Sequence, residues 1–119
     1  NDRIIIGIPF YGRTFSNSEG PGKSGNASGA VTQSAINSYL YENGSYVSGI
    51  EFWDDECKVP YLYIASKKLF VTYENPRSIQ EKMKYVGEQN LAGVMFWQNG
   101  QDYNEILMTA IRQNRSLMK

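Results

Sequence analysis

Four side chains suited to binding follow two apolar runs of this sequence. Tyr11 and Arg13 come just after the first run, and Trp97 and Gln98 stand at the end of the second. Phenol, guanidinium and amide groups donate hydrogen bonds, while an indole adds a flat apolar face. Parallel strands place functional side chains at their carboxyl ends, so these four belong on one face if both runs are such strands.

The residue types leave few kinds of catalysis open. The chain has no histidine and a single cysteine, Cys57, which excludes Ser–His–Asp and Cys–His nucleophiles and an internal disulfide. Imidazole and thiolate are the usual zinc ligands, so we expect no metal site, and no cofactor is implied. Catalysis would have to rest on carboxylates, tyrosines and groups of the substrate.

The charge balance argues against nucleic-acid and membrane partners. The 119 residues include 12 basic and 12 acidic side chains, and no basic run marks a surface for polyanions. The apolar runs are far shorter than the roughly 20 residues of a membrane-spanning helix. Nine Tyr, five Phe and two Trp suit stacking on sugars and equally an ordinary core.

The two apolar runs predict strands. Residues 3–10 read R-I-I-I-G-I-P-F, and residues 91–97 read L-A-G-V-M-F-W. Continuous apolar runs rich in β-branched residues are typical of parallel strands buried on both faces. Tyr11-Gly12-Arg13 is expected to form the exit turn of the first strand.

The segment between the runs has a mixed pattern. Residues 16–29, rich in Gly, Ser and Asn, predict a loop. Apolar spacing near 3.6 predicts a short helix over 30–42, which Asn43-Gly44 stops. Short stretches rich in β-branched and aromatic residues predict antiparallel strands over 46–53, 60–65 and 69–73.

Two further helices complete the pattern. Asn75-Pro76 predicts the N-cap and first residue of one of them. Its buried side is expected to hold Ile79, Met83 and Val86. Asp102 is expected to cap the last helix. Its inward stripe is predicted to be Ile106, Leu107, Ala110 and Ile111, with basic residues Arg112, Arg115 and Lys119 near its C-terminal end.

The order of the elements is strand, inserted α+β segment, helix, strand and helix. This order is typical of the end of a strand–helix repeat that carries an insertion. A complete (β/α)₈ barrel needs about 250 residues, so the chain is too short to be one. We therefore predict two parallel strand–helix units of an α/β barrel with a small inserted α+β domain.

Four segments, in order, resemble motifs of the chitinase-type glycoside hydrolases of family 18. Residues 6–15, I-G-I-P-F-Y-G-R-T-F, resemble G-[IL]-P-F-Y-G-R-x-[FW] on that family's seventh barrel strand. Residues 91–97 resemble L-[GA]-G-[VI]-M-[FI]-W on its eighth and last strand. Between them, residues 53–63 match W-D-x-x-x-x-V-P-Y-L-Y and residues 70–82 match F-x-[ST]-Y-[DE]-[DN]-P-x-S-[IL]-x-x-K.

The resemblance implies a division of the chain. Residues 1–15 and 71–119 would be the C-terminal part of a TIM barrel, and residues 16–70 the family's α+β insertion domain. The family's D-x-x-D-x-D-x-E signature, whose final Glu is the general acid, has no match in the sequence, and neither has its M-x-Y-D motif. The resemblance therefore implies a fragment that holds no catalytic residue and is inactive alone.

The family cleaves β-1,4 links between N-acetylglucosamine units with retention, using the substrate's own acetamido oxygen as nucleophile. The resemblance implies a parent chitinase that binds chitin or its oligosaccharides and is secreted or periplasmic. Two alternatives stay open: a noncatalytic chitin-binding lectin of the same fold, and a glucosaminidase acting on peptidoglycan. Unpaired strand edges of the isolated chain also predict a homodimer.

The resemblance also implies roles for the residues at the strand ends. Trp97 would form the floor under the sugar at the cleavage site, and Tyr11 and Arg13 would line the cleft. The alternatives are a core position for Trp97 and a loop-holding salt bridge for Arg13. Gln98 replaces a glutamate that is frequent in the family, which removes a charge from the cleft.

Two further candidates fall in the predicted insertion, which forms one wall of the family's groove. Trp53 either contacts the ligand or packs within the insertion. Asp54 either contacts the ligand or serves as a turn residue or cap. Glu51 is a third polar residue of this segment, and no positional argument gives it a role.

Overall fold

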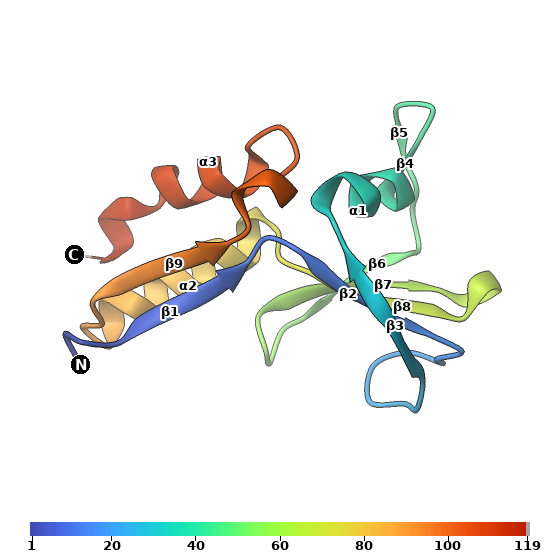
Figure 1. Ribbon diagram of the computed structural model, residues 1–119, viewed down its shortest axis with the longest axis horizontal. Helices are drawn as coiled ribbons and strands as arrows, with labels where there is room; N and C mark the ends of the chain where they lie inside the picture. Colours follow the sequence, from blue (N-terminus) through green and yellow to red (C-terminus); the bar gives the residue numbers. More distant parts are fainter. Residues whose placement is uncertain (119) are drawn as a thin grey trace.

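The computed structural model describes residues 1–118, so Lys119 at the predicted helix end lies outside the described residues. The elements form two parts, arranged along the longest dimension of 45 Å (Figure 1). The first part contains β1 (Ile5–Pro9), α2 (Pro76–Glu88), β9 (Gly93–Trp97) and α3 (Ile106–Gln113). The second contains a five-stranded sheet and α1 (Gln33–Leu40).

The first part is built on the predicted parallel pair. β1 and β9 pair in a register that sets Ile5 opposite Gly93 and Pro9 opposite Trp97. Helices α2 and α3 cover one face of the pair (Figure 1). The core between them consists of Ile8, Phe10, Ile79, Met83, Leu107, Ala110 and Ile111.

The other face of this pair is open. Ile5 is 55% exposed and Met95 is 52% exposed, because both side chains point away from α2 and α3. The expectation that both runs are buried on both faces is therefore wrong for the described residues. A homodimer through the strand edge stays a prediction. The molecular mass from sedimentation at increasing protein concentration tests it.

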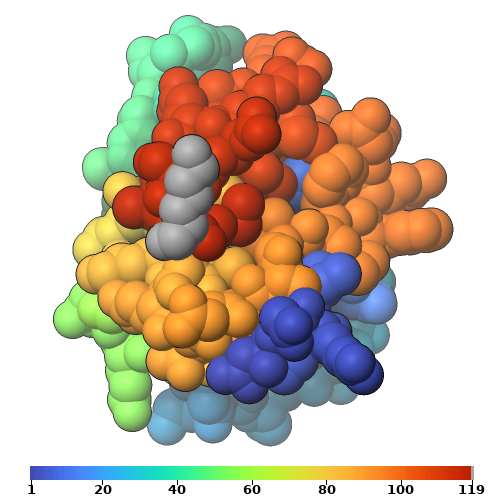
Figure 2. Space-filling model, turned by 90° about the vertical axis from the view of Figure 1, so that its left-hand side faces the viewer, coloured from blue at the N-terminus to red at the C-terminus, as the bar shows by residue number. Residues whose placement is uncertain are grey.

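The N-terminal residues and the C-terminal turn η3 lie at the same end of the first part (Figures 1 and 2). Ala92 N donates to the carbonyl of Ile4 at 2.7 Å, which ties the N-terminal residues to the turn before β9. The 3₁₀ turn η3 (Arg115–Met118) passes over α2 at Gly87. A Cβ on residue 87 would collide with the carbonyl of Leu117, so glycine allows this close packing.

The sheet of the second part is antiparallel and confirms the strands predicted over 60–65 and 69–73. Of the strand predicted over 46–53, only residues 51–53 pair in this sheet, because Tyr46 belongs to the separate hairpin strand β5 (Ser45–Tyr46). Its strand order is β3-β2-β8-β7-β6. The bounds are β2 (Gly12–Ser16), β3 (Asn26–Val31), β6 (Glu51–Asp54), β7 (Val59–Ile64) and β8 (Leu69–Thr72). Helix α1 lies on one face of this sheet and buries Ile36 with Leu62, Val71 and Tyr73.

Three expectations differ from the structure here. Residues 26–31 form strand β3, although 26–29 were predicted as loop and 30–31 as the start of a helix, because their backbone pairs with β2. Arg13 is in β2 and not in a turn. Asn43-Gly44, with φ of 50° and 79°, forms a tight hairpin turn and not a helix stop. The hairpin strands are β4 (Tyr41–Glu42) and β5 (Ser45–Tyr46).

The helix caps follow the sequence. Asn75 Oδ1 accepts from Ser78 N and Ser78 Oγ accepts from Asn75 N, both at 2.9 Å, which makes a capping box at α2. Asp102 accepts from the backbone N–H groups of Leu107 and Met108 at 3.0 Å. In α3, however, Ile106 is 40% exposed and does not belong to the inward stripe.

Replacing the N-cap residue tests the importance of α2. The Asn75→Ala variant should lose about 1 kcal/mol of unfolding free energy, because the backbone N–H of Ser78 loses its side-chain acceptor. Urea denaturation followed by circular dichroism measures the loss. Gln80→Ala, at an exposed position of the same helix, should stay within about 0.5 kcal/mol. Equal stability of both variants would contradict the capping role.

Candidate functional site

The carboxyl end of the β1–β9 pair carries a shallow groove of about 270 Å³, here called the Trp97 groove. It brings together Tyr11 and Trp97, two of the predicted binding residues. The residues that line the groove are Gly7, Ile8, Pro9, Tyr11, Met95, Phe96 and Trp97. Arg13, Gln98, Trp53 and Asp54 are not part of this lining.

Strand alternation decides the direction of Trp97. Its neighbour Phe96 turns towards the helices and stacks on Phe10, with ring centroids 4.7 Å apart and planes 8° apart. Phe10 N donates to the carbonyl of Trp97 at 2.6 Å and fixes the strand end. Trp97 therefore points away from the core and is 64% exposed, so it is not a core tryptophan of the described chain.

Arg13 and Tyr11 lie next to each other at the start of β2. The guanidinium carbon of Arg13 is 5.4 Å from the centroid of the Tyr11 ring, within cation–π range. Gly12 lies so close to β8 that a Cβ would be 2.7 Å from the carbonyl oxygen of Thr72. Within residues 1–118 Arg13 makes no ion pair, so the alternative of a loop-holding salt bridge is not realised there.

Gln98 is exposed and follows Trp97 directly. The peptide bond between the two residues is cis. The Gln98 carbonyl accepts from Gln101 N at 2.9 Å, where the 3₁₀ turn η2 (Asn99–Gln101) begins. Its side chain is a neutral amide, with two donors and an acceptor, where glutamate would carry a charge.

Trp53 and Asp54 lie on β6, at the edge of the five-stranded sheet. The ring of Trp53 packs under the guanidinium of Arg77, whose carbon is 3.9 Å from the ring centroid. Asp54 Oδ1 accepts from the backbone N–H groups two and three residues further on, at 3.0 and 2.9 Å. These contacts favour the packing and turn roles, although Asp54 also lines a cavity of about 220 Å³ that reaches Pro9.

The sequence was compared with models of protein families. The model of glycosyl hydrolases family 18 matches residues 1–102. The chain belongs to this family. The family predicted from the four motifs is thereby confirmed.

Relatives and solved structures agree with family 18 membership. The chain is 33% identical to chitinase B of Serratia marcescens, over 84% of this chain and 25% of that protein. A class V chitinase mutant from Cycas revoluta, in complex with (GlcNAc)3, has a TM-score of 0.73 and 26% identity, covering 92% of this chain and 33% of that one. A family 18 N-acetylglucosaminidase from Paenibacillus barengoltzii has a TM-score of 0.70 and 31% identity. The match covers 93% of this chain and 33% of that one.

The chain spans a quarter or less of the length of the first curated relatives that it matches. Its structural neighbours include family 18 enzymes, and the fold of this family is the TIM barrel, a repeat of eight strand–helix units. The predicted relation to this barrel family is thus confirmed at the level of the family. The activity and substrate of a whole protein are matters of proposal.

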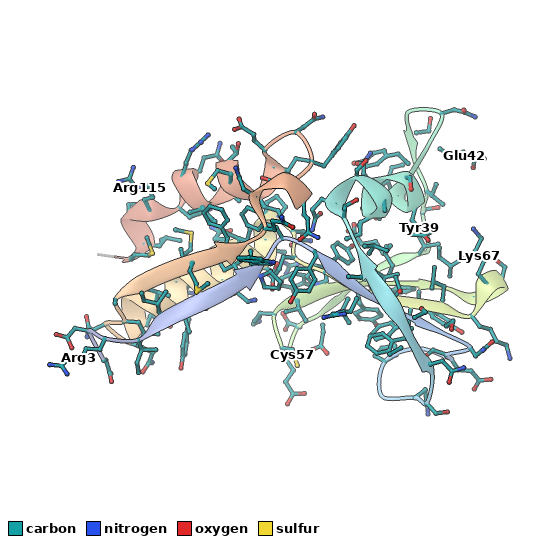
Figure 3. All side chains as sticks on the ribbon, in the orientation of Figure 1. Arg3, Tyr39, Glu42, Cys57, Lys67 and Arg115 are labelled. Atoms are coloured by element: carbon teal, nitrogen blue, oxygen red, sulfur yellow. The ribbon has the colours of Figure 1, made fainter. Side chains whose placement is uncertain are left out.

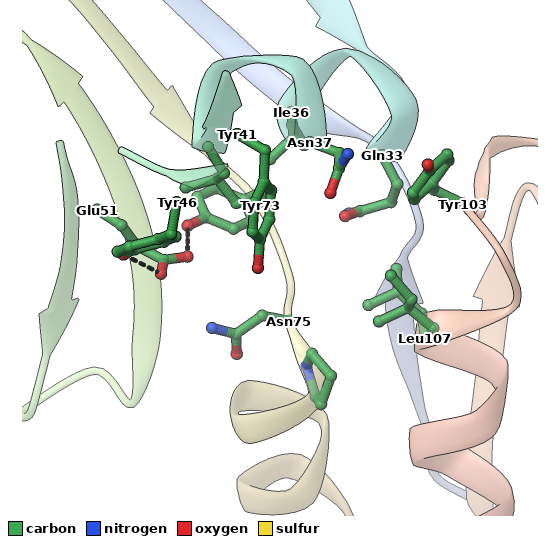
Figure 4. Close-up of a pocket in the computed structure, with 13 residues that line it drawn as sticks. Gln33, Ile36, Asn37, Tyr41, Tyr46, Glu51, Tyr73, Asn75, Tyr103 and Leu107 are labelled. Carbon is green, nitrogen blue, oxygen red and sulfur yellow. Dashed lines mark hydrogen bonds between the residues drawn. The ribbon is translucent and has the colours of Figure 1, made fainter. Parts of the chain in front are cut away.

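A further cavity in this family 18 chain lies between α1, the β4–β5 hairpin and the start of α3 (Figure 4). Its volume is about 310 Å³, and we call it the Glu51 pocket. The residues that line it are Gln33, Ile36, Asn37, Leu40, Tyr41, Tyr46, Glu51, Tyr73, Asn75, Pro76, Tyr103, Ile106 and Leu107.

Two tyrosines hold the carboxylate of this pocket. The Tyr46 hydroxyl donates to Glu51 Oε1 at 2.9 Å, and the Tyr73 hydroxyl donates to Glu51 Oε2 (Figure 4). No pattern in the sequence assigned a role to Glu51 or pointed to either tyrosine. The three residues meet only through the hairpin and the pairing of β6, β7 and β8, so no local periodicity could have found them.

The carboxylate changes the acidity of both phenols. Burial raises the pKa of Tyr73 well above its ordinary value, and the hydrogen bond to Glu51 raises it further. For Tyr46, which is largely exposed, the hydrogen bond to Glu51 is the main cause of a raised pKa. Both shifts have the sign expected next to a negative charge, because a phenolate there would be repelled.

No group of three or more potential metal ligands occurs within residues 1–118. Cys57 is free and exposed near the turn between β6 and β7 (Figure 3). The negative charge of Asp54 raises the pKa of its thiol, which lowers its thiolate fraction and hence its reactivity. None of the helices described in residues 1–118 is long and apolar enough to cross a membrane.

The raised pKa of Tyr73 predicts a loss of stability at high pH. Above the ordinary value of 10.0 the unfolded chain releases this proton while the folded chain keeps it, so stability falls as pH rises. The slope for one proton is at most about 1.4 kcal/mol per pH unit. Urea denaturation between pH 8 and pH 11 should therefore give a flatter profile for Tyr73→Phe than for the wild type. The exposed Tyr85→Phe should keep the wild-type slope, and identical slopes for all three proteins would contradict the assignment.

Proposed function

We propose that this chain supplies part of the sugar-binding cleft of a family 18 chitinase. The observation that carries the proposal is Trp97, whose ring is 64% exposed at the carboxyl end of β9 and shares a groove with Tyr11. A flat indole there can stack on a sugar ring, and its N–H can donate to a hydroxyl. The chitinases among the relatives, and the (GlcNAc)3 in the Cycas revoluta complex, support N-acetylglucosamine units as ligands.

In this proposal β1 and β9 are the seventh and eighth strands of a TIM barrel. The sequence divided the chain into residues 1–15 and 71–119 for the barrel and 16–70 for the insertion domain. Because β2 begins at Gly12 and β8 ends at Thr72, we place the whole five-stranded sheet, residues 12–72, in the insertion domain and the remaining residues in the barrel. The parallel pairing and the helices on one face support this, because a barrel strand carries helices outside and side chains inside. The open face with Met95 and Trp97 would then face the barrel interior.

The proposed reaction is retaining hydrolysis of β-1,4-linked N-acetylglucosamine polymers, in which the acetamido oxygen of the substrate is the nucleophile. The general acid would come from a D-x-x-D-x-D-x-E motif, which this sequence does not contain. Trp97 would form the floor of the cleft, and Tyr11, Arg13 and Gln98 would offer hydrogen bonds to sugar groups.

Trp53 and Asp54 would shape the wall of the cleft and have no part in the chemistry. Asp54 is the better placed of the two, because the cavity that it lines extends to Pro9 at the end of β1. We propose a secreted or periplasmic location for the parent protein. A noncatalytic lectin or a peptidoglycan-directed glucosaminidase would use the same groove. An intact acid motif in the parent protein would exclude the lectin. Assays of the parent protein on chitin oligomers and on peptidoglycan would distinguish the chitinase from the glucosaminidase.

Removing the indole tests the cleft. Trp97→Ala should bind (GlcNAc)3 at least about tenfold more weakly than the wild-type chain, which corresponds to about 1.4 kcal/mol. Isothermal titration calorimetry measures the affinity. Thermal stability should change little, because the side chain is largely exposed. Tyr85→Ala, an exposed aromatic on α2, is the matched control, and equal affinity of both variants would sink the proposed cleft.

Turnover by the chain itself is a separate test. The purified 119-residue chain should release no product from N-acetylglucosamine oligomers, because no acid at the required place replaces the missing motif. Chromatography of the oligomers after prolonged incubation measures this. Product formation above a heat-treated control would overturn the expectation.

A further inference from the structure

The Glu51 pocket is separate from the Trp97 groove. The two linings share no residue, and they are built from different elements. Its volume of about 310 Å³ stands at the lower end of small-molecule sites, which span about 300–1,000 Å³. It therefore suits one ring-sized ligand and not a long chain.

The pocket carries one negative charge and no positive one. Glu51 is the only residue of its lining that is charged at neutral pH, and no Lys or Arg takes part in the lining. Within residues 1–118 Glu51 forms no salt bridge. Its charge raises the pKa of both Tyr46 and Tyr73, which are the phenols nearest to it. The field inside the pocket opposes anions and favours a cation.

The aromatic rings of the pocket favour the same kind of ligand. Tyr41 and Tyr46 pack edge to face, with centroids 5.7 Å apart, and are 44% and 51% exposed. Tyr103 stands on the opposite side (Figure 4). Tyrosine faces attract ammonium groups, and a carboxylate beside them supplies a charged acceptor.

Neutral acceptors and donors complete the lining. Gln33 donates through Nε2 to the carbonyl of Glu74 at 3.2 Å, which orients the amide and leaves its Oε1 to accept. The amide of Asn37 lies beside it (Figure 4). Each oxygen of Glu51 accepts one tyrosine hydroxyl and keeps a lone pair for a further donor. Such a set can hold an ammonium group and several hydroxyls at once.

We propose that the Glu51 pocket binds a protonated amino sugar, a single glucosamine unit with a free amine. The ammonium group of the sugar forms a salt bridge with Glu51, and its hydroxyls form hydrogen bonds with the amides of Gln33 and Asn37. The sugar ring packs against Tyr41 and Tyr46. N-Acetylglucosamine has no positive charge and binds more weakly. The cationic part of the assignment rests on the pocket, and the sugar part rests on the proposed function, because removal of the acetyl group from a unit of chitin leaves a glucosamine unit.

The test is a titration of the Trp97→Ala chain, monitored by two-dimensional NMR. Glucosamine and N-acetylglucosamine are added separately at pH 6, where the amine of glucosamine is protonated. Glucosamine should shift backbone amide signals of residues 33–46 and bind about tenfold more tightly than N-acetylglucosamine. Glu51→Gln should lower the glucosamine affinity about tenfold, because it keeps the shape and removes the charge. Glu42→Gln, at an exposed carboxylate of the same hairpin, should bind like its parent.

Several results would overturn the proposal. These are no binding of glucosamine to the folded chain, equal binding of the two sugars, or an unchanged affinity in Glu51→Gln. If Glu51→Gln does not fold, Tyr41→Ala is used in its place, and the affinity of that variant for glucosamine should be severalfold lower. In addition, 0.5 M NaCl should weaken the binding of glucosamine to the chain with Glu51 intact. The chitinase proposal is tested separately, by the binding of (GlcNAc)3 to the wild-type chain and to Trp97→Ala. Because the glucosamine titration uses the Trp97→Ala chain, binding at Trp97 does not contribute to it.

Discussion

The parallel register of β1 and β9 decides the arrangement of the first part of the molecule. Because Pro9 stands opposite Trp97, the alternation of both strands sends Ile8 and Phe96 towards the helices and Met95 and Trp97 away from them. A shift by one residue would bury the indole and expose the phenylalanine that stacks on Phe10. The core and the groove thus depend on the same pairing.

Two short connections join this pair to the five-stranded sheet. Strand β1 leads into β2 within a few residues, and β8 leads into α2 through Tyr73, Glu74 and Asn75. Glu74 is buried and accepts from Ser78 Oγ at 2.6 Å and from the ammonium group of Lys82, which anchors this second connection to α2. These buried contacts of Glu74 fix the second connection against the first turns of α2.

The two cavities near this junction differ in their chemistry. The Trp97 groove has an apolar floor and no charged residue in its lining, which suits the faces of neutral sugar rings. The Glu51 pocket combines a carboxylate with tyrosines, which suits a cation. A protein with both surfaces would distinguish acetylated from deacetylated units of one polymer by charge.

Local features of the sequence were sufficient for the strands 3–10 and 91–97, the cap at Asn75 and the family motifs, because apolar runs, caps and turns are interactions between near neighbours. The strand at 26–31 was missed, since its mostly small residues carry no strand pattern and adopt β structure by pairing with β2. Tertiary structure alone determined that Trp97 is exposed and that Tyr46, Glu51 and Tyr73 meet. Those outcomes depend on which face of a strand is covered and on which distant strands are neighbours, and both are fixed by packing across the whole chain.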